Sequence, residues 1–126
     1  MLSSQNFFTV DIHTHIIPEN LPKWKEKFGY GEFVQLEHHK PCCARMMMDD
    51  AFFREIESNC WDPEQRLKEC GHHHVDVQVI STIPVMFSYW TEPKDGLEIA
   101  KFLNDHIADV CHRYPNRFVG LGTLPM

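Results

Sequence analysis

The chain has 126 residues, of which nine are histidine and five are cysteine, and its formal net charge is −6. This length suits one ordinary domain but not a complete α/β barrel, which takes about 200 residues or more. With more acidic than basic side chains, the composition gives no electrostatic case for binding nucleic acid or an anionic membrane. No run of about 18 apolar residues occurs, so we expect no membrane-spanning helix.

The predicted compartment follows from the N-terminus and the cysteines. No basic segment followed by an apolar segment opens the chain, so a secretory signal is not expected. The cysteines are odd in number and follow no regular framework: Cys42, Cys43, Cys60, Cys70 and Cys111. We therefore expect reduced thiols and a cytosolic protein.

The first predicted element is a strand at residues 7–12, where aromatic and β-branched side chains predict burial on both faces. Pro18 and Pro22 then interrupt the chain. Residues 17–61 are predicted to form a long irregular insert with some short helical patches. Regular structure is expected to resume only after this insert.

A helix is predicted to begin at Asp62, because Asp is a favoured N-cap and Pro63 suits the first helical position. Gly71 marks its expected end. Residues 75–81 are β-branched and predict a second strand. Residues 93–114 predict a helix, since apolar side chains recur at helical spacing. Residues 117–122 predict a third strand.

Strands that alternate with helices predict parallel pairing through right-handed crossovers. Three such strands with two helices amount to about three of the eight strands of a (β/α)8 TIM barrel. They equally suit half of a doubly wound sheet, and the pattern alone leaves both fold classes open.

His13 and His15 are the candidate metal ligands. Residues two apart on a strand point to the same side, and sites in parallel α/β folds lie at the carboxyl ends of strands. Two neutral imidazoles suit Zn²⁺, although a zinc site needs about three protein ligands. The alternative is that one histidine packs at the strand end and the other faces solvent. The position of the pair at the end of a buried strand favours the metal.

Two further clusters are interpreted as ordinary structure. His38-His39 and Cys42-Cys43 lie close together, but adjacent residues do not easily chelate one ion, so we interpret them as loop residues. The run from His72 to His74 follows the predicted helix end, where histidine interacts well with the helix dipole.

Arg54 is a candidate carboxylate-binding residue, because it lies beside Phe53 and arginine binds carboxylates through two hydrogen bonds. Its spacing alone favours a surface arginine paired with Glu55 or Glu57. The apolar run at residues 86–90 follows the second strand and is interpreted as core packing, with a pocket wall as the second choice.

The chain resembles a decarboxylase family of the amidohydrolase superfamily that acts in tryptophan breakdown through kynurenine. The resemblance covers residues 10–126, nearly the whole chain. The His-x-His pair marks only the superfamily, whereas the more specific segments are Lys-Phe-Gly-Tyr-Gly at 27–31, Val-Gln-Leu at 34–36, Asn-Cys-Trp-Asp-Pro at 59–63, Ser-Thr-Ile-Pro-Val-Met-Phe-Ser-Tyr-Trp at 81–90 and the run from Tyr114 to Met126.

The resemblance implies the N-terminal part of a TIM barrel with an insertion at about 17–61. It implies Zn²⁺ held by His13 and His15, and a substrate carboxylate bound by Arg54. It also implies non-oxidative decarboxylation of a small dicarboxylate that limits quinolinate formation, in a homodimer whose neighbouring subunit lends a second arginine.

The family's third histidine ligand, aspartate ligand and general-base histidine lie on later strands, so no catalytic residue is expected within these 126 residues. We expect a partial barrel domain that neither folds stably nor turns over substrate alone. Two alternatives stay open. One is a non-catalytic short isoform that acts as a binding partner, and the other is a different decarboxylase or hydrolase of the superfamily.

Overall fold

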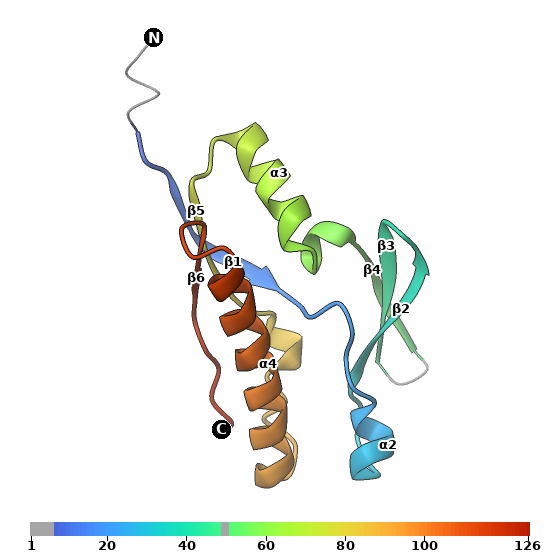
Figure 1. Ribbon diagram of the computed structural model, residues 1–126. Helices are drawn as coiled ribbons and strands as arrows, with labels where there is room; N and C mark the ends of the chain where they lie inside the picture. Colours follow the sequence, from blue (N-terminus) through green and yellow to red (C-terminus); the bar gives the residue numbers. More distant parts are fainter. Residues whose placement is uncertain (1–6, 49–50) are drawn as a thin grey trace.

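The computed structural model describes residues 7–48 and 51–126, and within them it contains two three-stranded sheets (Figure 1). One sheet is parallel in the order β1-β5-β6, and the other is antiparallel in the order β2-β3-β4. The elements are β1 (Val10–Ile16), α2 (Trp24–Phe28), β2 (Val34–Lys40), β3 (Cys43–Met48), β4 (Ala51–Glu57), η1 (Ser58–Cys60), α3 (Pro63–His73), β5 (Val77–Thr82), η2 (Pro84–Met86), α4 (Pro93–Arg113) and β6 (Phe118–Gly120).

The predicted order of parallel strands and helices is confirmed, and Figure 1 shows α4 lying along the parallel sheet. The predicted start of α3 is also confirmed. The Asp62 carboxylate accepts a hydrogen bond from the Glu64 backbone N–H at 2.9 Å, and Pro63 occupies the first turn. This cap satisfies one of the backbone donors that the start of a helix leaves free.

The predicted end of α3 is wrong, because Gly71 lies inside the helix. The helix continues to His73, and His74 takes the left-handed conformation at φ 57° that usually falls to glycine. The N–H groups of His74 and Val75 both bond to the Cys70 carbonyl. His72 and His73 lie in the last turn, as the helix-end interpretation of this histidine run predicts.

The predicted first strand is shifted, and its burial on both faces is wrong. The strand spans Val10–Ile16, so His13 and His15 lie within it. One face packs on the helices, where Ile16 joins Ile80, Ile107, Val110 and Phe118 in a buried cluster. The other face is bare in the described part of the chain, and Ile12 is 76% exposed. Aromatic and β-branched composition indicated the strand but could not show which face is covered.

The insert is far more regular than predicted. The helical patch corresponds to α2, but β2, β3 and β4 form an antiparallel sheet that the prediction missed. The strands carry a weak alternation signal, because apolar Val34 and Leu36 alternate with polar side chains. The insert core contains Trp24, Phe33, Ala44, Met46 and Ile56, and it is continuous with Ile99 and Leu103 of α4.

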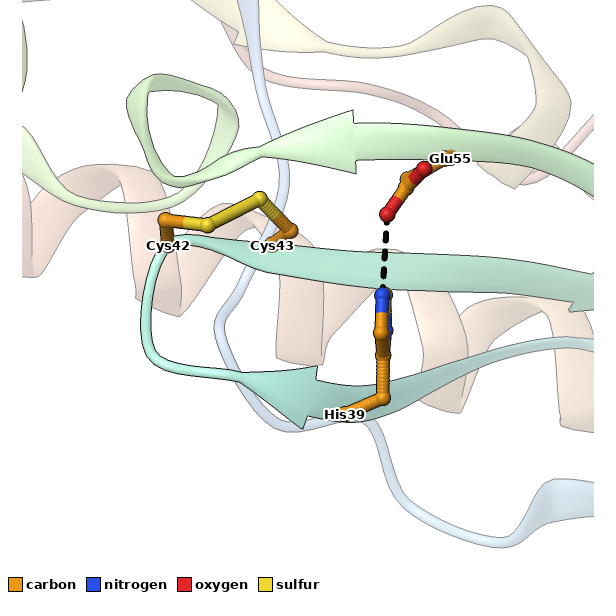
Figure 2. Close-up of a disulfide and its surroundings, with 4 residues drawn as sticks. All are labelled: His39, Cys42, Cys43 and Glu55. Carbon is orange, nitrogen blue, oxygen red and sulfur yellow. Dashed lines mark hydrogen bonds and ion pairs between the residues drawn. A yellow bond between two sulfur atoms is a disulfide. The ribbon is translucent and has the colours of Figure 1, made fainter.

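The expectation of reduced thiols is wrong for one pair. Cys42 and Cys43 form a disulfide at the turn between β2 and β3 (Figure 2). Cys60, Cys70 and Cys111 are free. The loop interpretation of the neighbouring histidines is also wrong, since both lie in β2, and the His39 ring bonds the Glu55 carboxylate of β4 at 2.8 Å (Figure 2).

Within the described ranges, no helix is long and apolar enough to cross a membrane.

Candidate metal and carboxylate site

A β-bulge in β1 sets the direction of the histidines. Asp11 pairs with Gln78 and Thr14 pairs with Ile80, so β1 holds one residue more than β5 over this stretch. Paired residues share a face of the sheet, which places His15 with Ser81 on the bare face and Asp11 with Gln78 on the helix-covered face. The Asp11 carboxylate accepts a hydrogen bond from the His13 backbone N–H at 3.2 Å and so supports the bulge.

The two candidate metal ligands lie side by side. The ring centroids of His13 and His15 are 5.1 Å apart, and the rings meet edge to face at 81°. His13 is exposed and His15 is half-buried. Nδ1 of His15 lies 3.1 Å from Oγ of Ser81 on β5. The structure therefore brings the predicted pair together on one face, near the carboxyl end of the parallel sheet.

Arg66 of α3 supports the same strand from the covered face. Its guanidinium donates hydrogen bonds to the His15 carbonyl, to Oγ1 of Thr14 at 3.0 Å and to Oε1 of Gln78 at 3.2 Å. The side chain is 8% exposed, and burial lowers the pKa of Arg66 from its ordinary value. Sequence reasoning missed this residue.

A signal for Arg66 was nevertheless present in the sequence. Arg66 falls between Pro63 and Cys70 at helical spacing, and all three residues are buried. An arginine on the buried stripe of a helix needs acceptors inside the protein, because a buried charge without hydrogen bonds is costly.

Arg54 and His15 line one cavity of about 300 Å³, although they come from different sheets. Its other lining residues include Met46, Phe53, Cys60 and Val85. The Arg54 guanidinium lies 5.1 Å from the centroid of the Phe53 ring. The pairing with Glu55 or Glu57 expected from spacing is not formed, and across residues 7–48 and 51–126 no carboxylate pairs with Arg54.

Cys60 is the one thiol in the lining of this cavity. Burial raises the pKa of Cys60 from its ordinary value, which keeps the thiol protonated at neutral pH. Because the thiolate is the reactive form of cysteine, Cys60 is a poor nucleophile. The cavity therefore combines an imidazole and a guanidinium with mainly apolar walls.

The residues present fit part of a zinc site. Zinc accepts neutral imidazole nitrogens, and the two rings are close enough for their nitrogens to approach one ion. No group of three or more His, Cys, Asp or Glu side chains suited to a metal ion occurs among the described residues. The histidine pair thus provides two ligands of a site that needs more.

Comparison with known proteins identifies the relatives of this chain. It is 58% identical over 117 residues to 2-amino-3-carboxymuconate-6-semialdehyde decarboxylase of Dictyostelium discoideum, a match that covers 93% of this chain and 33% of the relative. The chain is a sequence relative of this decarboxylase. The protein of the same name from Caenorhabditis elegans is 45% identical over 117 residues, a match that covers 93% of this chain and 29% of the relative. The chain therefore spans about a third of the length of these curated relatives. No profile of a protein family matches it.

Solved structures show the same fold. Metarhizium anisopliae IDCase in apo form gives a TM-score of 0.71 at 23% identity, covering 99% of this chain and 36% of that one. The 5-carboxyvanillate decarboxylase of Novosphingobium aromaticivorans, crystallised with manganese, gives a TM-score of 0.62 at 14% identity. This match covers 97% of the present chain and 35% of the decarboxylase chain. The chain has the α/β fold of part of a TIM barrel, with an antiparallel insert. This resolves the two fold classes left open by the strand order.

Proposed function

We propose that the chain carries part of the active site of a metal-dependent decarboxylase acting on 2-amino-3-carboxymuconate 6-semialdehyde. His13 and His15 hold Zn²⁺, and Arg54 binds a substrate carboxylate. The observation that carries the proposal is the cavity lined by both His15 and Arg54, whose guanidinium has no carboxylate partner among the described residues. The 58% identity to a decarboxylase of this name supports the choice of substrate.

The role of Arg54 follows from its surroundings. A guanidinium with no carboxylate partner in the described part of the chain is available to an anionic ligand. Arginine binds a carboxylate through two parallel hydrogen bonds, which fixes both position and orientation. The apolar walls contributed by Met46, Phe53 and Val85 lower the local polarity and so strengthen this attraction.

The histidines define where the metal lies relative to the bound carboxylate. When bound, Zn²⁺ supplies Lewis acidity and the means to activate water at neutral pH. The proposal also requires groups outside these 126 residues. They are the remaining metal ligands, a general-base histidine, and a second arginine from the neighbouring subunit of a homodimer. The same proposal places the reaction in the cytosol, in the breakdown of tryptophan through kynurenine.

The first experiment is to read the transcript beyond the codon for Met126. An open frame that encodes further histidines and an aspartate supports the proposal, and an immediate stop codon contradicts it. The protein expressed from its complete reading frame is then assayed for CO₂ release from the semialdehyde.

Arg54→Ala tests the carboxylate contact in that assay. A hydrogen bond to a charged group contributes about 1.5–3 kcal/mol, so kcat/KM should fall roughly 10- to 100-fold. Arg45→Ala is the matched control, because Arg45 is a half-exposed arginine of β3 that pairs with Glu37 at 3.0 Å. Equal activity of the two variants would contradict the assignment of Arg54.

Decarboxylation of a hydroxylated aromatic acid is a second candidate function. Gamma-resorcylate decarboxylase of Rhizobium radiobacter is 28% identical over 76 residues, covering 60% of this chain and 23% of the relative. The same assay with 2,6-dihydroxybenzoate separates the two candidates. Turnover of the benzoate without turnover of the semialdehyde would favour this second function.

A further inference from the structure

We propose that Ser81 is a positioning residue that holds the His15 ring in one tautomer, with Nδ1 protonated and Nε2 free to bind the metal. The inference rests on the proposed function of His15 as a metal ligand. Ser81 lies outside the His-x-His pair and comes from a different strand, so no motif in the sequence links it to the site.

The fold brings Ser81 to the ring through strand register. β1 and β5 run parallel, and His15 is the direct partner of Ser81 in the ladder. Paired residues project from the same face of a sheet, so the hydroxyl lies beside the imidazole on the bare face. The distance from Ser81 Oγ to His15 Nδ1 is 3.1 Å, which is a normal hydrogen bond.

The direction of this hydrogen bond follows from the second contact of the hydroxyl. Ser81 Oγ also lies 3.5 Å from the Thr14 carbonyl oxygen. A carbonyl oxygen carries no proton, so in this longer hydrogen bond the Ser81 hydroxyl must be the donor. A hydroxyl has one proton and two lone pairs, so a lone pair of Oγ is left to accept a hydrogen bond from Nδ1–H of His15. The neutral ring then has no proton on Nε2, and the lone pair of Nε2 is available.

The backbone of His15 is fixed separately. Arg66 donates to the His15 carbonyl from the covered face of the sheet, so the main chain is fixed by α3 and the ring by β5. His15 is half-buried and lines the cavity shared with Arg54. The hydrogen bond that His15 donates to Ser81 therefore determines which ring nitrogen is offered to a ligand in that cavity.

The size of the expected effect comes from metal sites in general. Metal-binding histidines donate their other ring N–H to a neighbouring group, and loss of that group costs about 10- to 100-fold in metal affinity or activity. Ser81→Ala removes the acceptor without adding volume. Ser81→Thr keeps the hydroxyl. Ser88→Ala is the matched control, because its hydroxyl bonds the Met86 carbonyl at 3.2 Å and does not contact His15.

The first measurement needs no metal. Nitrogen-15 NMR of the imidazoles, on the protein expressed from its complete reading frame, reports which ring nitrogen is protonated at a pH where the ring is neutral. We expect His15 to have Nδ1 protonated in the unmodified protein, in Ser81→Thr and in Ser88→Ala, but a mixture of tautomers in Ser81→Ala. The Nε2–H form in the unmodified protein would overturn the inference.

The second measurement is titration with zinc chloride against a chromophoric chelator. Ser81→Ala should bind zinc roughly 10- to 100-fold more weakly than the unmodified protein, and Ser81→Thr should recover most of that affinity. Affinities within twofold for Ser81→Ala and the unmodified protein would overturn the inference, even if decarboxylation proceeds. An unmodified protein that binds no zinc would instead refute the proposed function, while the NMR result would still decide the role of Ser81.

Discussion

The two sheets of this molecule bury their side chains very differently. The antiparallel insert closes on α2 and α4, with Trp24 at 2% exposure and Ala44 at 0%. The parallel sheet buries one face only, and on its other face Ile12 is 76% exposed and Val119 is 51% exposed, within the residues that the structure describes. His13 and His15 belong to this second region. Because little packs against this face, His13 and His15 are positioned by hydrogen bonds instead. Asp11 bonds the His13 backbone, Arg66 bonds the His15 carbonyl and Ser81 bonds the His15 ring.

The largest effect should come from the closed core of the insert. Trp24 contacts Phe33 and Phe102, with ring centroids 6.2 Å and 5.6 Å apart. Trp24→Ala should lower the free energy of unfolding by about 3–5 kcal/mol, because a buried aromatic ring leaves a cavity when removed. Urea denaturation of the protein expressed from its complete reading frame measures this loss.

The matched variant of the open face is Ile12→Ala. This side chain is mostly exposed among the described residues, so its contacts within them predict a change in the free energy of unfolding of no more than about 0.5 kcal/mol. A loss at Ile12 as large as that at Trp24 would remove the contrast between the two sheets and show that the open face is covered in the folded protein.

A smaller effect is expected where the covered face of β1 meets α3. Arg66→Met leaves the His15 carbonyl, Thr14 and Gln78 without their donor, and this should cost about 2 kcal/mol of stability. Arg113→Met is the control, because Arg113 is half-exposed and forms an i,i+4 pair with Asp109. If both variants lose the same small amount of unfolding free energy, the hydrogen bonds of Arg66 do not stabilise the parallel sheet.

The cap of α3 should contribute less. Asp62→Ala removes the acceptor for the Glu64 N–H and should cost about 1 kcal/mol. Asp62→Asn is the control, because asparagine also caps helices and should retain most of the stability. Equal losses in both variants would point to the charge of Asp62 instead of its hydrogen bond.

A comparably small effect should come from reducing the disulfide of the insert. Cys42 and Cys43 are adjacent, so their bond closes the shortest possible loop, and reduction should cost about 1 kcal/mol or less. Among the five cysteines of the 126 residues, thiol titration of the protein unfolded without a reductant should detect Cys60, Cys70 and Cys111 and not the bonded pair. Five reactive thiols before reduction would contradict the bond.

The parallel half of the fold could be predicted because its signals are local. A capping Asp, a Pro at the helix start and apolar residues at helical spacing each act over a few residues. The insert carries only a weak alternation of apolar and polar residues, and the pairing of its strands depends on contacts across the sheet. The helix end at His74 was missed because a non-glycine residue adopts the left-handed conformation there.

The candidate site was predictable only in part for the same reason. His13 and His15 are close in sequence, and strand geometry brings them together. The shared cavity of His15 and Arg54 depends on how two sheets meet, which spacing along the chain does not contain. Ser81 and Arg66 reach His15 across 66 and 51 positions of the sequence, so no local pattern could reveal them.

The bulge in β1 has a consequence for changes in chain length. Between Asp11 and Thr14, β1 holds two residues, Ile12 and His13, where β5 holds one. Deleting Ile12 would restore a regular ladder and leave both histidines on the same face, because His13 would then align with Val79. Deleting Thr14 would make the histidines adjacent and send them to opposite faces. Two deletions in one short strand should thus have opposite outcomes, and we expect this strand to tolerate a change of length before His13 but not between the two histidines.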